Sequence, residues 1–147
     1  MTGYNFKKYC LEILYEKVPE INNLEEPLKS DLEFHLEDDE PLVYCIYEDV
    51  VAIYFMQLIK KKDRKSLDIV RRIAELIEEF VEHENFDVRC LVKVGFLESL
   101  LSRIEPRKDV EKYLLPKTLE MARAVGKHMY GFDPQTWEVM KKNSRKK

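Results

Sequence analysis

The sequence predicts an all-α protein, and three observations support this. The chain of 147 residues has only 4 glycines and 6 prolines, so the tight turns of an all-β fold are scarce. Apolar residues recur at intervals of three and four along most of the chain, as they do on the buried face of a helix. Prolines and helix-capping residues divide this pattern into about seven segments. We therefore expect an irregular bundle of about seven helices.

The first three segments lie in the first 61 residues. The first helix is expected over residues 6–17, where it stops before a proline. The second is expected over residues 24–36, with Asn23 as its N-cap. The third is expected over residues 41–61, since Pro41 suits a first helical turn. Because this third segment is apolar over most of its circumference, we expect it to be the central, most buried helix.

Four further segments follow. An amphipathic helix is expected over residues 63–83, and Asn85 caps the next one, which ends at Pro106. A sixth helix is expected over residues 108–129, kinked or split at its internal proline. A short last helix is expected over residues 134–141.

The short connection between the fourth and fifth segments predicts an antiparallel hairpin. Hairpins of this length, laid side by side, give a bundle with a stacked, HEAT-like character, although the sequence shows no clean repeat period. We expect one α-helical domain over residues 1–142 and a basic C-terminal tail over residues 143–147.

The composition of the chain limits the cellular location that we expect for the protein. No stretch reaches the roughly 18 apolar residues of a membrane span, so no membrane partner is expected. The N-terminus carries charges throughout and resembles no secretory signal, which favours a cytoplasmic protein. The 3 cysteines are isolated from one another and from the histidines, a pattern that argues against a disulfide scaffold and against a zinc site.

Charge is distributed unevenly along the chain. Residues 1–50 carry thirteen acidic residues and four lysines, whereas the remaining residues carry fifteen acidic and 21 basic ones. From Glu33 to Asp49 there are seven acidic residues and no lysine or arginine. One or two carboxylates satisfy the partial positive charge of a helix N-terminus, and four in succession exceed that need.

Acidic side chains interleaved with tyrosines make a surface suited to a basic protein, because charge speeds the encounter and aromatic rings supply affinity. A second interpretation stays open: a solvated capping turn, with the tyrosines half-buried in the core. Under the first interpretation the expected partner-binding residues are Glu37, Asp38, Asp39, Glu40, Tyr44, Tyr47, Glu48 and Asp49.

No motif indicates catalysis, a metal or a cofactor. The acidic stretch lacks the alternation and the glycine of a calcium loop, and none of the 3 histidines completes a metal-binding motif. There is no nucleophile elbow and no glycine-rich phosphate loop. The lysine-rich stretch at residues 60–65 could touch nucleic acid, but the acidic balance of the whole chain opposes that interpretation. We expect neither an enzyme nor a nucleic-acid-binding protein.

One predicted hairpin resembles a sequence pattern of a known family. Residues 79–104, EFVEHENFDVRCLVKVGFLESLLSRI, resemble a pattern in small α-helical immunity proteins of bacterial contact-dependent inhibition and polymorphic toxin systems. The matching residues are Phe80, Val81, Glu82, Asp87, Val88, Val94, Gly95, Phe96, Leu97, Glu98 and Leu100. The resemblance implies a cytoplasmic protein that binds and neutralises one cognate toxin domain, often a basic nuclease, as a heterodimer. It also implies that Gly95 lets two helices approach closely.

Two other functions remain open. A HEAT-like scaffold or adaptor would recognise a different protein partner without inhibiting a toxin. A small helical enzyme would assemble its site from isolated Glu, Tyr and His residues, and would then show a deep pocket with converging titratable groups.

Overall fold

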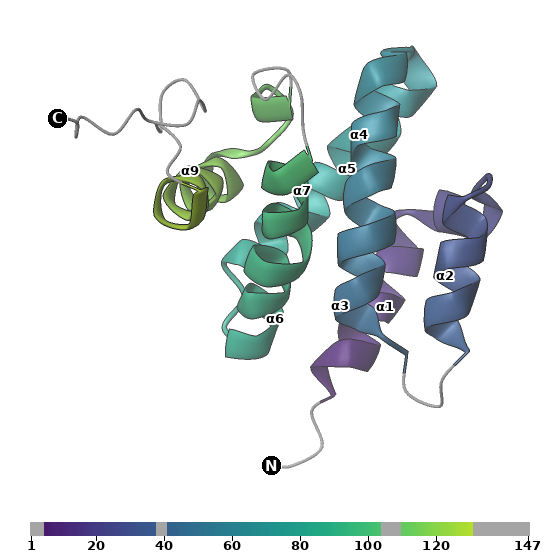
Figure 1. Ribbon diagram of the computed structural model, residues 1–147, viewed down its shortest axis with the longest axis horizontal. Coiled ribbons are helices and arrows are strands. Elements are labelled where there is room, and N and C mark those ends of the chain that lie inside the picture. Colours follow the sequence, from purple (N-terminus) through teal and green to yellow (C-terminus); the bar gives the residue numbers. More distant parts are fainter. Residues whose placement is uncertain (1–4, 38–40, 104–109, 131–147) are drawn as a thin grey trace, which may run out of the picture.

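The computed structural model describes residues 5–37, 41–103 and 110–130 (Figure 1). All regular structure in these ranges is helical, so the predicted all-α class is confirmed. In chain order the helices are α1 (Phe6–Lys17), the 3₁₀ helix η1 (Pro19–Asn23), α2 (Leu28–Leu36), α3 (Val43–Ile46), the π-helical segment η2 (Tyr47–Val51), α4 (Ala52–Lys61), α5 (Arg64–Val81), α6 (Phe86–Cys90), the π-helical segment η3 (Leu91–Leu97), α7 (Glu98–Arg103) and α9 (Pro116–Tyr130).

The central helix is the continuous run of α3, η2 and α4, as the sequence predicted. Figure 1 shows it in the middle of the molecule, with α2 on one side and α6 and α7 on the other. Its apolar positions are buried, and Phe55 meets Phe96 of η3 edge-on, with 5.5 Å between ring centroids. The helix begins at Val43 rather than at Pro41, because Leu42 precedes it in a non-helical conformation.

The two π-helical segments, η2 and η3, pack against each other, and Gly95 lies at their contact. A Cβ atom on Gly95 would lie 3.3 Å from the Leu91 side chain and 3.5 Å from both the Tyr44 carbonyl and the Tyr47 Cβ. The expected close approach of two helices at Gly95 is thus confirmed. A hydrogen bond from Ser99 Oγ to the Glu48 carbonyl (2.7 Å) also ties α7 to η2.

The predicted hairpin is formed by α5 and α6. Asp63 caps α5 by accepting the Ser66 amide hydrogen (2.8 Å), and Asn85 caps α6 by accepting the Asp87 and Val88 amide hydrogens. Only four residues separate Val81 from the next helix, so the chain reverses there.

The expected N-cap of the second helix is wrong. Asn23 ends the 3₁₀ turn, and α2 begins at Leu28 without a side-chain cap. The physical reason is Leu24, which is 7% exposed and extended: the chain must first carry this side chain into the core. The Glu26 carboxylate instead accepts the Ser30 amide hydrogen (3.1 Å).

The sixth segment is split at Pro116, as predicted, since α9 begins there. The predicted end of the fifth helix at Pro106, the predicted short helix over residues 134–141 and the C-terminal tail lie outside the described residues. Within the described ranges, no helix is both long and apolar enough to cross a bilayer.

Candidate functional site

Exposed carboxylates and two exposed apolar side chains occur on α2 and at the start of the central helix. The Leu42 amide donates to the His35 carbonyl (3.1 Å), which places Leu42 beside the last turn of α2. We call this region the acidic surface and define it by Asp31, Glu33, Phe34, Glu37, Leu42, Cys45, Glu48 and Asp49.

Two residues of the acidic surface, Phe34 and Leu42, are exposed and apolar. The Phe34 side chain is 63% exposed and Leu42 is 40% exposed. Among the described residues only Phe86 and Val94 are large apolar side chains of comparable exposure. The neighbouring positions Leu28, Leu32 and His35 form the buried stripe of α2, so Phe34 lies off that stripe and faces solvent.

Asp49 joins three helices at the edge of the acidic surface. Its carboxylate lies 3.3 Å from His35 Nε2 on α2 and 3.4 Å from an Arg103 guanidinium nitrogen on α7. His35 is 8% exposed, and its Nδ1 is buried without a hydrogen-bond partner among the described residues. Asp49 is therefore partly neutralised by the protein itself and serves mainly to hold α2 against η2.

The other carboxylates of the acidic surface differ from Asp49 in their surroundings. Asp31, Glu33, Glu37 and Glu48 form no ion pair within the described part of the chain. Positive charge is scarce in this part of the sequence, because residues 18–59 hold eleven acidic residues and one lysine, Lys29. A surface of this kind produces a negative potential that is only weakly compensated.

The structure brings only some of the expected partner-binding residues together. Glu48 and Asp49 lie close enough to Cys45 to add to the rise of its pKa, which burial of the thiol mainly causes. Glu37 follows the last turn of α2, two residues after His35. Asp38, Asp39 and Glu40 lie outside the described residues.

The two expected anchor tyrosines differ in burial, and the assignment of Tyr44 to a binding face stays a prediction. Tyr47 is fully buried, and its hydroxyl donates to the Cys10 carbonyl (2.8 Å), so its assignment to the partner-binding face is wrong. Tyr44 is half-buried, and its ring meets Phe6 of α1 edge-on at 6.3 Å. Burial raises the pKa of Tyr44, with smaller contributions from groups on α6 and α1, so its surroundings are those helices rather than α2.

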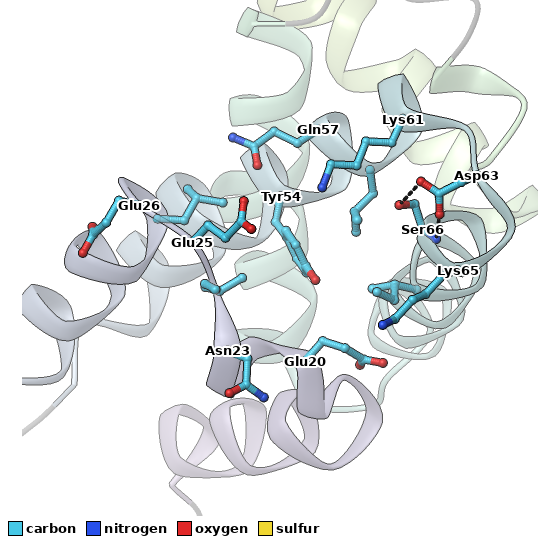
Figure 2. A pocket seen from close by; sticks show the side chains of 14 residues that line it. Glu20, Asn23, Glu25, Glu26, Tyr54, Gln57, Lys61, Asp63, Lys65 and Ser66 are labelled. Atoms are coloured by element: carbon cyan, nitrogen blue, oxygen red, sulfur yellow. Dashed lines mark hydrogen bonds between the residues drawn. The ribbon is translucent and has the colours of Figure 1, made fainter.

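A separate pocket of about 440 Å³ opens between η1, the start of α2, α4 and the start of α5 (Figure 2). Its apolar lining consists of Leu24, Leu28, Leu58 and Ile69, all largely buried. Figure 2 shows Glu25 and Lys61 extending toward Tyr54 from different sides, whereas Glu26 points away. Sequence reasoning missed this pocket because its walls come from residues up to 49 positions apart.

The described residues offer little for metal or thiol chemistry. No group of three His, Cys, Asp or Glu side chains within them could hold a metal ion. Burial raises the pKa of Cys10 to about 12, which keeps this thiol protonated and unreactive near neutral pH.

Comparisons with known proteins add one finding. A family model described as a domain of unknown function (DUF7674) matches residues 11–131, which span α1 to α9 and include the whole acidic surface and the pocket. No curated protein and no solved structure matches the chain.

Proposed function

This chain belongs to the DUF7674 family, and we propose that it is a binding protein whose acidic surface docks a basic protein domain. The observation that carries the proposal is that exposed Phe34 and Leu42 lie on neighbouring elements that also carry carboxylates without an ion-pair partner among the described residues. Protein interfaces obtain most of their affinity from a few apolar or aromatic anchors, and charges at the rim govern the rate and specificity of encounter.

The charge on this surface selects the class of partner. A nucleic acid would be repelled, because its phosphates carry the same sign as Glu33, Glu37 and Glu48. A basic protein would be attracted, and carboxylates can occupy the positions that phosphates take in the cleft of a nuclease. The proposal therefore takes its specific form from the resemblance: an immunity protein that blocks one cognate toxin domain.

The scaffold or adaptor alternative requires a different partner for the same surface. The two functions differ in the outcome of binding, because an immunity protein abolishes the partner's activity at equimolar concentration and an adaptor leaves it intact. An immunity gene also lies directly downstream of the gene for its toxin, so the product of the adjacent upstream gene is the partner to purify.

The test measures binding kinetics of that product to the parent and to three variants. We expect Phe34→Ala to speed dissociation, with a loss of about 2 kcal/mol in binding free energy. The double reversal Glu33→Lys/Glu37→Lys should slow association and flatten its salt dependence.

The control reverses two exposed carboxylates in the turn between α5 and α6, Glu82→Lys/Glu84→Lys, which changes net charge equally. If both double reversals change association to the same extent, net charge rather than the acidic surface controls the encounter, and the site assignment fails. If the parent itself does not bind or inhibit the purified product, the immunity function fails.

A further inference from the structure

We propose that the pocket between η1, α2, α4 and α5 binds a small zwitterion, with an ammonium group at one end and a carboxylate at the other. This site lies apart from the acidic surface, and its test is independent of the protein-binding function. The inference follows from how charge, hydrogen-bonding groups and apolar lining are arranged around the cavity.

The two sides of the pocket carry opposite charges that do not pair with each other. Glu25 comes from the segment before α2, whereas Lys61 and Lys65 come from the end of α4 and the start of α5. None of these three side chains forms an ion pair with any residue that the structure describes. A ligand with both charges would satisfy the two sides at once.

The other carboxylates around the pocket are already engaged. Both oxygens of Glu20 accept hydrogen bonds from the Arg72 guanidinium (2.8 and 2.7 Å). Glu26 accepts the Ser30 amide hydrogen, and Asp63 caps α5. Glu25 therefore remains the carboxylate available to an ammonium group.

Tyr54 stands between the two sides and has a free hydroxyl. Its ring is half-buried against the apolar lining, and its hydroxyl has no hydrogen-bond partner among the described residues. Burial raises the pKa of Tyr54, and the nearby carboxylate of Glu20 raises it further, so the phenol stays protonated. A protonated phenol can donate to a carboxylate or accept from an ammonium group.

The size and lining of the pocket fit a small organic molecule. A volume of about 440 Å³ falls within the roughly 300–1,000 Å³ of small-molecule sites. The half-buried ring of Tyr54, together with the exposed edges of the apolar lining, would contact a short aliphatic chain that joins the two ends of the ligand. A flexible ω-amino acid or a dipeptide has these properties.

The first experiment titrates the protein with 6-aminohexanoate and follows backbone amide chemical shifts by NMR. We expect saturable shifts at Glu25, Tyr54 and Lys61, and an affinity at least about tenfold higher than for hexanoate or hexylamine. That ratio corresponds to one additional charged hydrogen bond. Equal affinity for the three compounds, or no saturable shift near Tyr54, would overturn the proposal.

The second experiment assigns the binding to the two sides of the pocket. Glu25→Gln and Lys61→Gln should each weaken 6-aminohexanoate binding about tenfold while removing its advantage over hexanoate and hexylamine respectively. Both residues are exposed, so the fold should be preserved. The matched controls, Glu16→Gln on α1 and Lys60→Gln beside Lys61, lie outside the pocket lining and should bind as the parent does. Equal affinity in parent and pocket variants contradicts the assignment.

Discussion

Helices α5 and α2 both pack against the central helix, yet they use charge in opposite ways. In α5, nearly every charged side chain of the middle turns has a partner within the protein. Arg71 binds Asp68 and Glu75, and Arg72 binds Asp68 and Glu20. These contacts connect α5 to itself and to η1.

The exposed acidic residues of α2 have no such partners among the described residues. Its exposed acids Asp31 and Glu33 form no ion pair among the described residues, its start has no side-chain cap, and Phe34 projects into solvent. This difference indicates that the charged side chains of α5 stabilise the fold, whereas the exposed ones of α2 are available to a binding partner. Five predictions can break or sharpen this comparison.

The largest loss of stability is expected from Phe80→Ala in α5. This ring is 1% exposed and packs near Tyr9 and Tyr47, so its removal leaves a cavity that should cost roughly 3–5 kcal/mol of unfolding free energy. The matched change in α2, Phe34→Ala, should stay within about 0.5 kcal/mol. Denaturant unfolding of both variants checks this, and a comparable loss in Phe34→Ala would show that α2 is part of the folding core after all.

The second-largest loss of stability is expected from Glu78→Ala. The Glu78 carboxylate accepts the Lys117 and Thr118 amide hydrogens (3.0 and 2.8 Å) and the Thr118 hydroxyl (2.8 Å), so it caps α9 from another helix. Loss of such a cap should cost about 1–2 kcal/mol. Exposed Glu82→Ala is the control, and it should change stability little.

The Glu78 cap also has a pH signature. Burial alone would raise the pKa of Glu78, but the hydrogen bonds from Lys117 and Thr118 outweigh it, so the pKa is lowered in the folded protein. The stabilisation is therefore complete above the ordinary pKa of 4.5 and is lost as the pH falls through the lowered value. Parent and Glu78→Ala should accordingly converge in stability in acid, and a constant difference from pH 7 to pH 2 would contradict the cap.

A smaller effect is expected from Glu20→Gln, which removes the charge from the bidentate pair with Arg72. The pair lies near the surface, where solvent screens it, so we expect a loss of about 1 kcal/mol. The side-chain hydrogen bond from Arg72 is the main reason for the lowered pKa of Glu20, so this contribution also disappears in acid. Thermal unfolding of the parent and Glu20→Gln at pH 7 measures the loss of stability, and the same comparison at low pH shows whether the loss disappears. An unchanged melting temperature for Glu20→Gln at pH 7 would contradict this prediction.

The smallest change in stability is expected from Asp31→Lys/Glu33→Lys in α2. Because these carboxylates have no partners within the described structure, reversing them should alter unfolding free energy by less than about 0.5 kcal/mol. A destabilisation of 2 kcal/mol would show that α2 charges maintain the fold as those of α5 do, and the comparison would collapse.

Much of the local structure could be predicted because its causes are local. The bounds of α1, the cap Asn85 and the break at Pro116 depend on residues within a few positions of each other. Where a cause was distant, prediction failed. Asn23 was assigned as a cap because nothing near it shows that Leu24 must enter the core.

The candidate site was predicted less well for the same reason. Glu48 and Asp49 both lie near Cys45, whereas the assignment of Glu37, Glu48 and Asp49 to one partner-binding face stays a prediction. Phe34 was overlooked, although its place off the buried stripe of Leu28, Leu32 and His35 was a usable signal. No local signal indicated that Glu78 caps a helix that begins 38 positions later.

The sequence by itself determined the helical class, most helix limits and the acidic character of residues 18–59, because periodicity, capping and charge are properties of neighbouring residues. Only the tertiary structure decided which side chains are covered. Tyr47 is buried because α1 and α5 pack over it, and Phe34 is exposed because no described helix covers that side of α2. Burial depends on contacts between segments far apart in the chain, and periodicity alone cannot specify those contacts.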